Sequence, residues 1–326
     1  MTFMEATTTD GDISSQAIFF VNGTQIEGNT FIPTEANDTN KVYATYNGLT
    51  SSTINFASTE VIPSAYTQKV LFEDYTGTWC GWCPRMTTIV HYLTDYSDRI
   101  IPIAIHTEGA PQDPWMYEHA KDMQSSSNYD AGAAPAGQIN RIYHFDPFQN
   151  SHPCPNEPEI YYPQLDEFLN QSAPLGLAVN SSLNGNNLDI TVKVGFTTDS
   201  VPDARLVVNL VEDNLFYYQY NYFSGSGVTC DSEFDYANMP HPIPNFQHDH
   251  VLLKSFTDIY GDVIPQNQIT NGGIYTQDFN VQLPSNVTNS QNLTIVAFVL
   301  GNGNQISTRE VINVQSAQVG TNQDFD

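Results

Sequence analysis

The feature that most constrains the fold is a single stretch, VLFEDYTGTWCGWCP, at residues 70–84. Its apolar and aromatic start predicts a β-strand over Val70–Tyr75, and a helix is expected over Cys80–Tyr96. Two cysteines, Cys80 and Cys83, stand at the turn between them. In that place the first thiol caps the helix N-terminus, where the helix dipole and free N–H groups lower the pKa of the thiol. The stretch therefore predicts a redox centre in which Cys80 attacks a substrate disulfide and Cys83 resolves the mixed disulfide.

The four cysteines also bear on two other kinds of site. A C-x-x-C pair can be half of a zinc site, but no second pair follows in this sequence. The remaining cysteines, Cys154 and Cys230, are isolated, and parity in an oxidising compartment predicts that they form a structural disulfide. The alternatives are two free thiols, or one thiol that acts as a further redox partner.

The residues around the C-x-x-C pair, 68–172, alternate between strand and helix patterns. Further strands are expected at Ile100–His106 and Pro135–Arg141, and further helices at Asp113–Gln124 and Ile160–Gln171. The first of these helices is expected to begin with its aspartate as N-cap, followed by a proline at the first position. This order of elements predicts an α/β domain.

Both flanks of this domain are predicted to be β-structure. After a polar tail at residues 1–15, residues 16–65 contain Asn-Gly turns at Asn22–Gly23 and Asn47–Gly48, each between strand patterns, which is typical of β-hairpins. They predict a small immunoglobulin-like β module. Residues 173–326 hold seven strand candidates and predict an antiparallel β-sandwich. The expected fold class is therefore α+β multidomain, with a central α/β domain between two β modules.

At this point the chain resembles the thioredoxin-like proteins, and the resemblance extends beyond the cysteines. Trp79 precedes the pair, Asp74 lies six residues before Cys80, and Ala134–Pro135 stands at the start of a later strand. The resemblance implies that the central domain is thioredoxin-like and that Asp74 helps to deprotonate the resolving thiol. It also implies a cis bond before Pro135, which would present a backbone edge to the bound substrate.

The same resemblance assigns substrate binding to Trp79, Trp82 and Ala134. Two features depart from the family pattern. The dipeptide between the cysteines is Gly-Trp rather than Gly-Pro, so the redox poise cannot be carried over. A proline directly follows the second cysteine, which the first helical turn tolerates because it needs no donated N–H. Alternative interpretations are that Glu73 rather than Asp74 faces inward, and that the two tryptophans simply cover the disulfide.

A wider resemblance covers most of the chain. Its motifs occur in order: TGTWCGWCPR at Thr76–Arg85, APAGQINR at Ala134–Arg141, HDHVLLKSF at His248–Phe256 and VINVQSAQVG at Val311–Gly320. In these the chain is similar to the outer-membrane-protein-twenty-eight-related family of Bacteroidota surface proteins and lipoproteins. The resemblance implies a cell-surface or secreted location, a thioredoxin-like centre and a β-sandwich tail. It supplies no settled activity.

The charge balance limits the partners. The chain has 36 acidic and 10 basic residues and a formal net charge of −26, which excludes nucleic acid as a favourable partner because the phosphates would be repelled. The acidic surface favours solubility, and no cofactor motif is found. Calcium would suit the clustered carboxylates at Asp10–Asp12 or Asp231–Asp235, although neither matches the twelve-residue calcium loop. His248 and His250, two residues apart on one expected strand face, are weak candidates for a metal site.

Several features favour an extracytoplasmic location. No run of about 20 apolar residues is present, so no transmembrane helix is expected. The first residues carry no signal peptide pattern, so either the protein stays inside the cell or this is a mature chain whose leader was removed, and the other features favour the second. The four cysteines and the acidic surface point the same way.

Two hypotheses of different class follow. The first is an extracytoplasmic thiol-disulfide oxidoreductase that acts on protein thiols or disulfides. The second is a structural or adhesive surface protein, a homo-oligomer or a subunit of a larger assembly, whose C-x-x-C disulfide is static. Exposure of Cys80 distinguishes them: a reductase needs an open face at the pair, whereas a scaffold can bury it, for instance under the N-terminal module.

Overall fold

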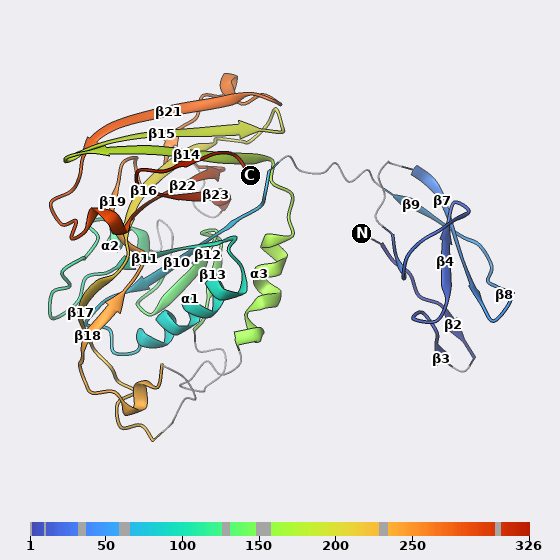
Figure 1. The fold of residues 1–326 in the computed structure, drawn as a ribbon, viewed down its shortest axis with the longest axis horizontal. Coiled ribbons are helices and arrows are strands. Elements are labelled where there is room, and N and C mark those ends of the chain that lie inside the picture. The colour runs from blue at the N-terminus through green and yellow to red at the C-terminus, as the bar shows by residue number, and fades with distance from the viewer. Residues whose placement is uncertain are drawn as a thin grey trace. The chain divides into compact units, whose positions relative to one another are not determined.

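The chain divides into two compact units, Met1–Pro63 and Ser64–Asp326, which we describe separately. A computed structural model describes residues 2–9, 11–31, 37–58, 66–125, 131–147, 158–227, 234–303 and 308–326 (Figure 1).

The first unit is a small β-structure. Its main sheet has five strands in the order β5-β4-β7-β8, with β9 also paired to β7. Both Asn-Gly turns adopt positive φ at each residue, as the hairpins require, at Asn22–Gly23 and Asn47–Gly48. Phe19 and Met4 are buried in its core, so the polar N-terminal segment contributes to the packing. The strands are β1 Thr2–Phe3, β2 Thr7–Thr8, β3 Gly11–Asp12, β4 Ile18–Val21, β5 Thr24–Gln25, β6 Thr30–Phe31, β7 Asn37–Tyr46, β8 Leu49–Thr50 and β9 Ile54–Ser58.

The second unit is built on one nine-stranded mixed sheet. The strand order is β13-β12-β10-β11-β19-β16-β22-β23, and β20 pairs with β16 beside this path. Every residue of β10 is buried, which agrees with its almost continuous apolar sequence. The strands are β10 Val70–Thr76, β11 Ile100–His106, β12 Ala136–Ile139, β13 Tyr143–Phe145, β16 Arg205–Glu212, β19 Val251–Ser255, β20 Asp262–Val263, β22 Leu293–Gly301 and β23 Glu310–Gln318.

A second, four-stranded sheet of order β21-β15-β14-β24 packs on the C-terminal half of the large sheet (Figure 1). The core between the two sheets is aliphatic, with Leu177 and Val192 of the small sheet packed among Leu206, Val208 and Ala297 of the large one. Because both inner faces are apolar, this layer buries them against each other. The strands are β14 Leu175–Asn184, β15 Asn187–Phe196, β21 Ile274–Gln282 and β24 Asn322–Gln323.

Helices cover the N-terminal strands of the large sheet, and a separate hairpin lies beside them. Helices α1 and α3 pack on β10 and β11 through Phe72, Met86, Ile89 and Leu165. A two-stranded hairpin, β17 with β18, joins none of the larger sheets. The bounds are α1 Pro84–Tyr96, α2 Ala120–Gln124, α3 Tyr162–Leu169, β17 Leu215–Gln219 and β18 Ile243–His248, and short 3-10 helices span Pro158–Ile160, Tyr236–Asn238, Gln266–Gln268 and Ser290–Asn292.

The predicted fold class, a central thioredoxin-like α/β domain flanked by an N-terminal β module and a C-terminal β-sandwich, is wrong. The structure is mostly β, and the strands expected in the central domain are part of the same sheet as the strands expected in the sandwich. The two groups of strands are connected by the parallel pairing of β11 with β19, where the amide of Ala104 donates to the carbonyl of His250 at 2.8 Å. A buried strand edge needs partners for its backbone groups, and β19 supplies them here.

The long helix expected over Asp113–Gln124 is also reduced to its last five residues, α2. Asp113 does not cap it. Its carboxylate accepts the amides of Thr78 and Trp115 at 2.7 and 2.8 Å and contacts His106. These tertiary contacts fix the first half of the segment in an irregular conformation, because a carboxylate that meets distant donors is no longer available to its own helix.

Candidate functional site

The two cysteines of the C-x-x-C turn form a disulfide that lies beneath the surface. Its Cα–Cα distance is 5.4 Å, and Cys80 and Cys83 are only 4% and 1% exposed. The helix begins at Pro84, with Cys83 in the N-cap position and without a side-chain cap hydrogen bond. The expected helix start at Cys80 is therefore one turn too early. Pro84 sets the start, since a proline without N–H fits the first helical position.

The disulfide loop is covered by a segment from the C-terminal half, residues 215–223, which we call the strap. The strap consists of β17 and the four residues after it. Within it, the side-chain amide of Gln219, 2% exposed, donates to the carbonyls of Cys80 at 2.8 Å and Gly77 at 3.2 Å. One buried side chain thus holds two carbonyls of the turn.

Backbone hydrogen bonds bind the strap to the turn on either side of Cys80. The amide of Tyr220 donates to the carbonyl of Thr78, and that of Tyr222 donates to the carbonyl of Gly81, each at 2.8 Å. The strap therefore runs along the turn as an added extended segment. Exposure of the sulfur atoms requires that these bonds break together.

The closest packing in this cover is between Gly81 and Tyr222. A Cβ at position 81 would lie 2.3 Å from the Cγ atom of Tyr222, so Gly81→Ala must displace the strap. We expect this variant to lose about 1–3 kcal/mol of unfolding free energy, and its disulfide to be reduced several-fold faster by dithiothreitol. The double variant Gly81→Ala/Tyr222→Ala should restore slow reduction, since it removes the clashing ring. Equal reduction rates in wild type and Gly81→Ala would show that the strap does not control access.

The two tryptophans of the motif differ in their surroundings. The indole N–H of Trp79 donates to the carbonyl of Thr107 at 3.1 Å, and its half-buried ring packs on Gly109, where a Cβ would lie 2.0 Å away. Trp82 is 46% exposed and contacts the rings of Tyr222 and Phe223 edge-on. Trp79 therefore fixes the turn from within, whereas Trp82 adds to the surface of the strap.

Ala134 and Pro135 are half-buried and joined by the expected cis peptide bond. The antiparallel pairing of Tyr75 with Ala136 places Pro135 beside Thr76, at the end of β10 from which the cysteine turn departs. The backbone arrangement that the sequence predicted at this position is thus present. Its role in substrate binding stays a prediction.

Glu73 and Asp74 are both buried, on opposite faces of β10. The Glu73 carboxylate is 2.7 Å from the guanidinium of Arg141, which also donates to the carbonyl of Ile259. Asp74 faces α1 and is 5% exposed, and its Oδ1 has no hydrogen-bond partner among the described residues. Burial raises the pKa of Asp74 to about 8. The carboxyl group is therefore largely protonated at neutral pH.

A buried group of polar and aromatic side chains lies close to Asp74. The Nδ1 atom of His106 is 2.9 Å from the Asp113 carboxylate, and the His106 ring centroid is 5.5 Å from that of His248. Burial alone would raise the pKa of Asp113, but its hydrogen bond with His106 and its backbone donors outweigh that effect and lower it. Burial and the neighbouring His106 lower the pKa of His248 to about 3, so its imidazole is neutral. No spacing in the sequence predicts that these three residues meet.

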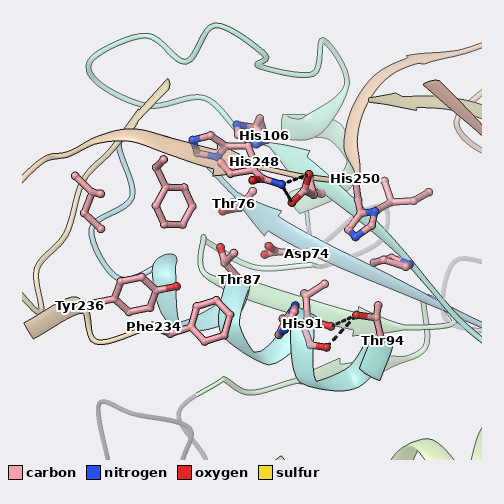
Figure 2. A pocket seen from close by; sticks show the side chains of 18 of the residues that line it. Asp74, Thr76, Thr87, His91, Thr94, His106, Phe234, Tyr236, His248 and His250 are labelled. Atoms are coloured by element: carbon pink, nitrogen blue, oxygen red, sulfur yellow. Dashed lines mark hydrogen bonds between the residues drawn. The ribbon is translucent and has the colours of Figure 1, made fainter. Parts of the chain in front are cut away.

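Asp74, His106 and His248 line a cavity of about 500 Å³ (Figure 2). Its walls are α1, the ends of β10 and β11, strand β18 and the segment around Tyr236. The disulfide is not among its lining residues. The chain thus holds two neighbouring features, a covered disulfide and a separate cavity.

The other predicted site residues are not brought together. His248 ends β18, whereas His250 follows it with a φ of 58° and contacts Asp213 at 3.1 Å, so the two imidazoles share no strand face. In the part of the chain that the structure describes, no three histidine, cysteine or acidic side chains are placed to hold a metal ion. Cys154 and Cys230 lie outside the described residues, as does part of the Asp231–Asp235 segment.

The strap also carries an exposed row of rings that sequence reasoning missed. Tyr217, Tyr218 and Tyr220 follow one another at centroid distances of 4.5 and 5.6 Å, and His241 links Tyr220 to Tyr222. The signal was available in the sequence as LFYYQYNYF at residues 215–223. Phe216, Tyr217 and Tyr222 are 52%, 39% and 51% exposed, an unusual density of large apolar side chains on a surface.

The fold and site define a β-rich protein with a covered disulfide. A sequence model described as outer membrane protein Omp28 matches residues 122–323, and the chain belongs to this family. It is therefore an Omp28-related surface protein, and its location is extracytoplasmic. None of the helices in the described residues is long and apolar enough to cross a membrane.

Comparison with solved structures finds proteins of similar fold. The structure of HBP35 of Porphyromonas gingivalis is similar with a TM-score of 0.57 and 15% identity, over 78% of this chain and 76% of that one. At this identity the likeness concerns the fold alone. A β-glucosidase from Kluyveromyces marxianus matches with a TM-score of 0.22 and 9% identity, over 95% of this chain and 42% of that one, too weak to support an argument. No curated protein matches the sequence.

Proposed function

We propose that this chain is a structural or adhesive component of the cell surface, in which the Cys80–Cys83 disulfide is static. The observation that carries the proposal is the burial of both cysteines under the strap. Thiol-disulfide exchange requires that a thiolate reach one sulfur atom. With Cys80 4% exposed and its carbonyl held by Gln219, the folded protein offers no such approach.

The exposed rings of the strap support an adhesive role. Tyrosine and tryptophan are enriched in protein interfaces because they bury a large area with few rotatable bonds. Trp82 and Tyr222 form a continuous exposed surface at the end of this row. The net charge of −26 disfavours acidic partners, so other surface proteins with neutral or basic faces are the partners proposed.

Reduction of the disulfide in the folded and unfolded protein tests the static role. We expect the folded protein to show no insulin reductase turnover, and to be reduced by dithiothreitol far more slowly when folded than in denaturant. The Cys80→Ser/Cys83→Ser variant should stay folded and lose about 2 kcal/mol of unfolding free energy, as loop closure across so short a segment predicts. Insulin reduction by the wild type that is absent in the double serine variant would contradict the proposal.

A second candidate, thiol-disulfide oxidoreductase activity, is favoured by two observations. The cis Ala134–Pro135 bond lies at the end of β10, and the protonated Asp74 lies on the face of β10 that packs on α1. In this role, once the strap has lifted, Cys80 would attack and Cys83 would resolve, and the fraction of Asp74 that is ionised would accept the proton of the Cys83 thiol. The reduction potential of the pair separates the two functions: a very low value supports a structural bridge, whereas a value near that of known oxidoreductases supports exchange.

A further inference from the structure

The cavity beside the disulfide has the features of a binding site that the proposed function does not use. Figure 2 shows Asp74 near its centre, with His106 and His248 on one side and Thr87, Phe234 and Tyr236 on the other. Its volume of about 500 Å³ falls within the range of small-molecule sites. Aromatic and aliphatic side chains supply the apolar parts of the wall, and polar side chains, among them four histidines and two aspartates, supply the rest.

Two buried acceptor atoms in this cavity have no donor. Oδ1 of Asp74 and Nε2 of His248 lack hydrogen-bond partners among the described residues, and the two side chains are 5% and 7% exposed. Buried polar groups are nearly always paired, since an unpaired one loses its hydration without compensation. Their shared cavity indicates that a ligand supplies the missing donors.

The protonation state of His248 determines which hydrogen bonds its imidazole can make. A hydrogen bond to the backbone of Tyr218 occupies the ring, and the unpartnered nitrogen is Nε2. If the proton of the neutral imidazole lies on the nitrogen bonded to Tyr218, Nε2 offers a lone pair to the cavity. An anionic ligand would therefore meet the lone pair of Nε2 and, wherever Asp74 is ionised, a second negative charge, which disfavours it.

The charges of the lining favour a cation. Neither lysine nor arginine is among the lining residues, and three of the four lining histidines are paired with acids: His91 with Asp95, His106 with Asp113 and His250 with Asp213. Asp249 adds a further acidic group at the edge. A metal ion is not favoured, because no third ligand completes a set with Asp74 and His248 among the described residues.

We propose that this cavity binds a small organic cation, a primary ammonium on a short apolar or aromatic body, whose N–H groups supply the donors that Asp74 and His248 lack. The ammonium lies at Asp74, and the body lies against the rings of Phe234 and Phe246, where a cation is also attracted to the ring faces. An uncharged hydroxyl compound could donate to the same atoms, but it would leave the buried carboxyl group without a counter-charge.

Binding of an ammonium is coupled to ionisation of Asp74. With its pKa near 8, about one carboxyl group in ten is ionised at pH 7, which weakens binding about tenfold relative to high pH. The other titratable groups that line the cavity are His91 on α1, His106 on β11, Tyr236, and the set His248, Asp249 and His250 at the end of β18. Affinity for the ammonium should therefore rise about tenfold from pH 6 to pH 7 and level off above pH 8, with a proton released on binding.

Calorimetry with phenethylamine, and with 2-phenylethanol as its uncharged counterpart, tests this inference. We expect phenethylamine to bind the whole chain with the pH dependence above, and 2-phenylethanol to bind at least tenfold more weakly at pH 8. Asp74→Asn should weaken phenethylamine binding at least tenfold at pH 8 and abolish its pH dependence. Asp166→Asn, a half-buried acid outside the cavity, is the matched control and should leave phenethylamine binding unchanged.

Three outcomes would overturn the inference: no phenethylamine binding at millimolar concentration, equal binding of 2-phenylethanol, or unchanged binding by Asp74→Asn. Thermal unfolding of each variant at the same pH verifies that it is folded. Because the ligand assay involves neither cysteine, its result is independent of the reduction experiments on the disulfide.

Discussion

Replacing Glu73 with glutamine is expected to lower the free energy of unfolding by about 3–5 kcal/mol, because it leaves the guanidinium of Arg141 buried without its counter-charge. The two side chains are 1% and 2% exposed, and the Arg141 Nε and Nη2 atoms lie 2.7–3.1 Å from the carboxylate. Removing one partner of such a pair costs much unfolding free energy, because the attraction that offset the desolvation of the remaining ion is gone. Urea unfolding at constant pH measures the change.

The control for this prediction replaces both partners. Glu73→Leu/Arg141→Met keeps the volume and removes both charges, and it is expected to stay within about 2 kcal/mol of the wild type. Methionine can retain contact with the Phe298 ring, over which the guanidinium lies at 4.8 Å. Equal losses in the single and double variants would mean that packing at these positions, rather than an unpaired charge, determines the cost.

The other contacts of Arg141 tie the central region to strands outside it, so that it does not form a domain of its own. Arg141 follows β12, bonds to Glu73 of β10 and to the carbonyl of Ile259, and packs on Phe298 of β22. A single charged side chain thus connects strands that the sequence assigned to two domains. The contact of Arg141 with Glu73 spans 68 residues, and local patterning carries no information on pairings at that range.

The sequence predicted individual elements well where patterning is local. The strand expected at Ile100–His106 is β11, which has those bounds, and the Asn-Gly turns and the cis bond before Pro135 are present. The sequence did not predict which strands pair with each other. The edge of β11 could pair with any nearby strand, and its pairing with β19 follows from the packing of the whole chain.

The candidate site was predictable to a similar extent. The acid and the cysteines of one continuous stretch were found, because their spacing is local. The strap over the cysteines was not predicted. Gln219 is remote from Cys80 in sequence, and the aromatic segment that contains Gln219 has no alternating pattern that would show which side faces the protein. His248 was considered as a strand-face ligand, whereas the positive φ of His250 turns the chain between them and leaves His248 facing His106.

The second large effect is expected from Asp74→Asn, measured as unfolding free energy against pH. The folded pKa of Asp74, about 8, is above its ordinary value of 3.8, so the folded state retains a proton that the unfolded state releases between these values. The protonated Asp74 carboxyl group contributes fully to stability below pH 3.8. This contribution is lost as the pH rises towards 8, by about 1.4 kcal/mol per pH unit. Asparagine keeps the shape of the protonated carboxyl group and does not titrate. The unfolding free energy of Asp74→Asn, relative to that of the wild type, should therefore increase steadily from pH 3.8 to pH 8.

His248 produces the opposite slope over part of the same range. Its pKa falls from 6.5 to about 3 on folding, so the unfolded state binds the extra proton between these values and stability rises with pH there. Between pH 4 and 6.5 the two slopes nearly cancel in the wild type, which should be flat there and then lose stability up to pH 8. Asp74→Asn should instead rise to pH 6.5 and stay level, and His248→Asn should fall throughout. Because other titrating groups are common to all three proteins, the differences between their curves isolate these two residues. Parallel curves for wild type and Asp74→Asn would mean that Asp74 titrates normally in the folded chain, and that the cavity is more hydrated than its burial implies.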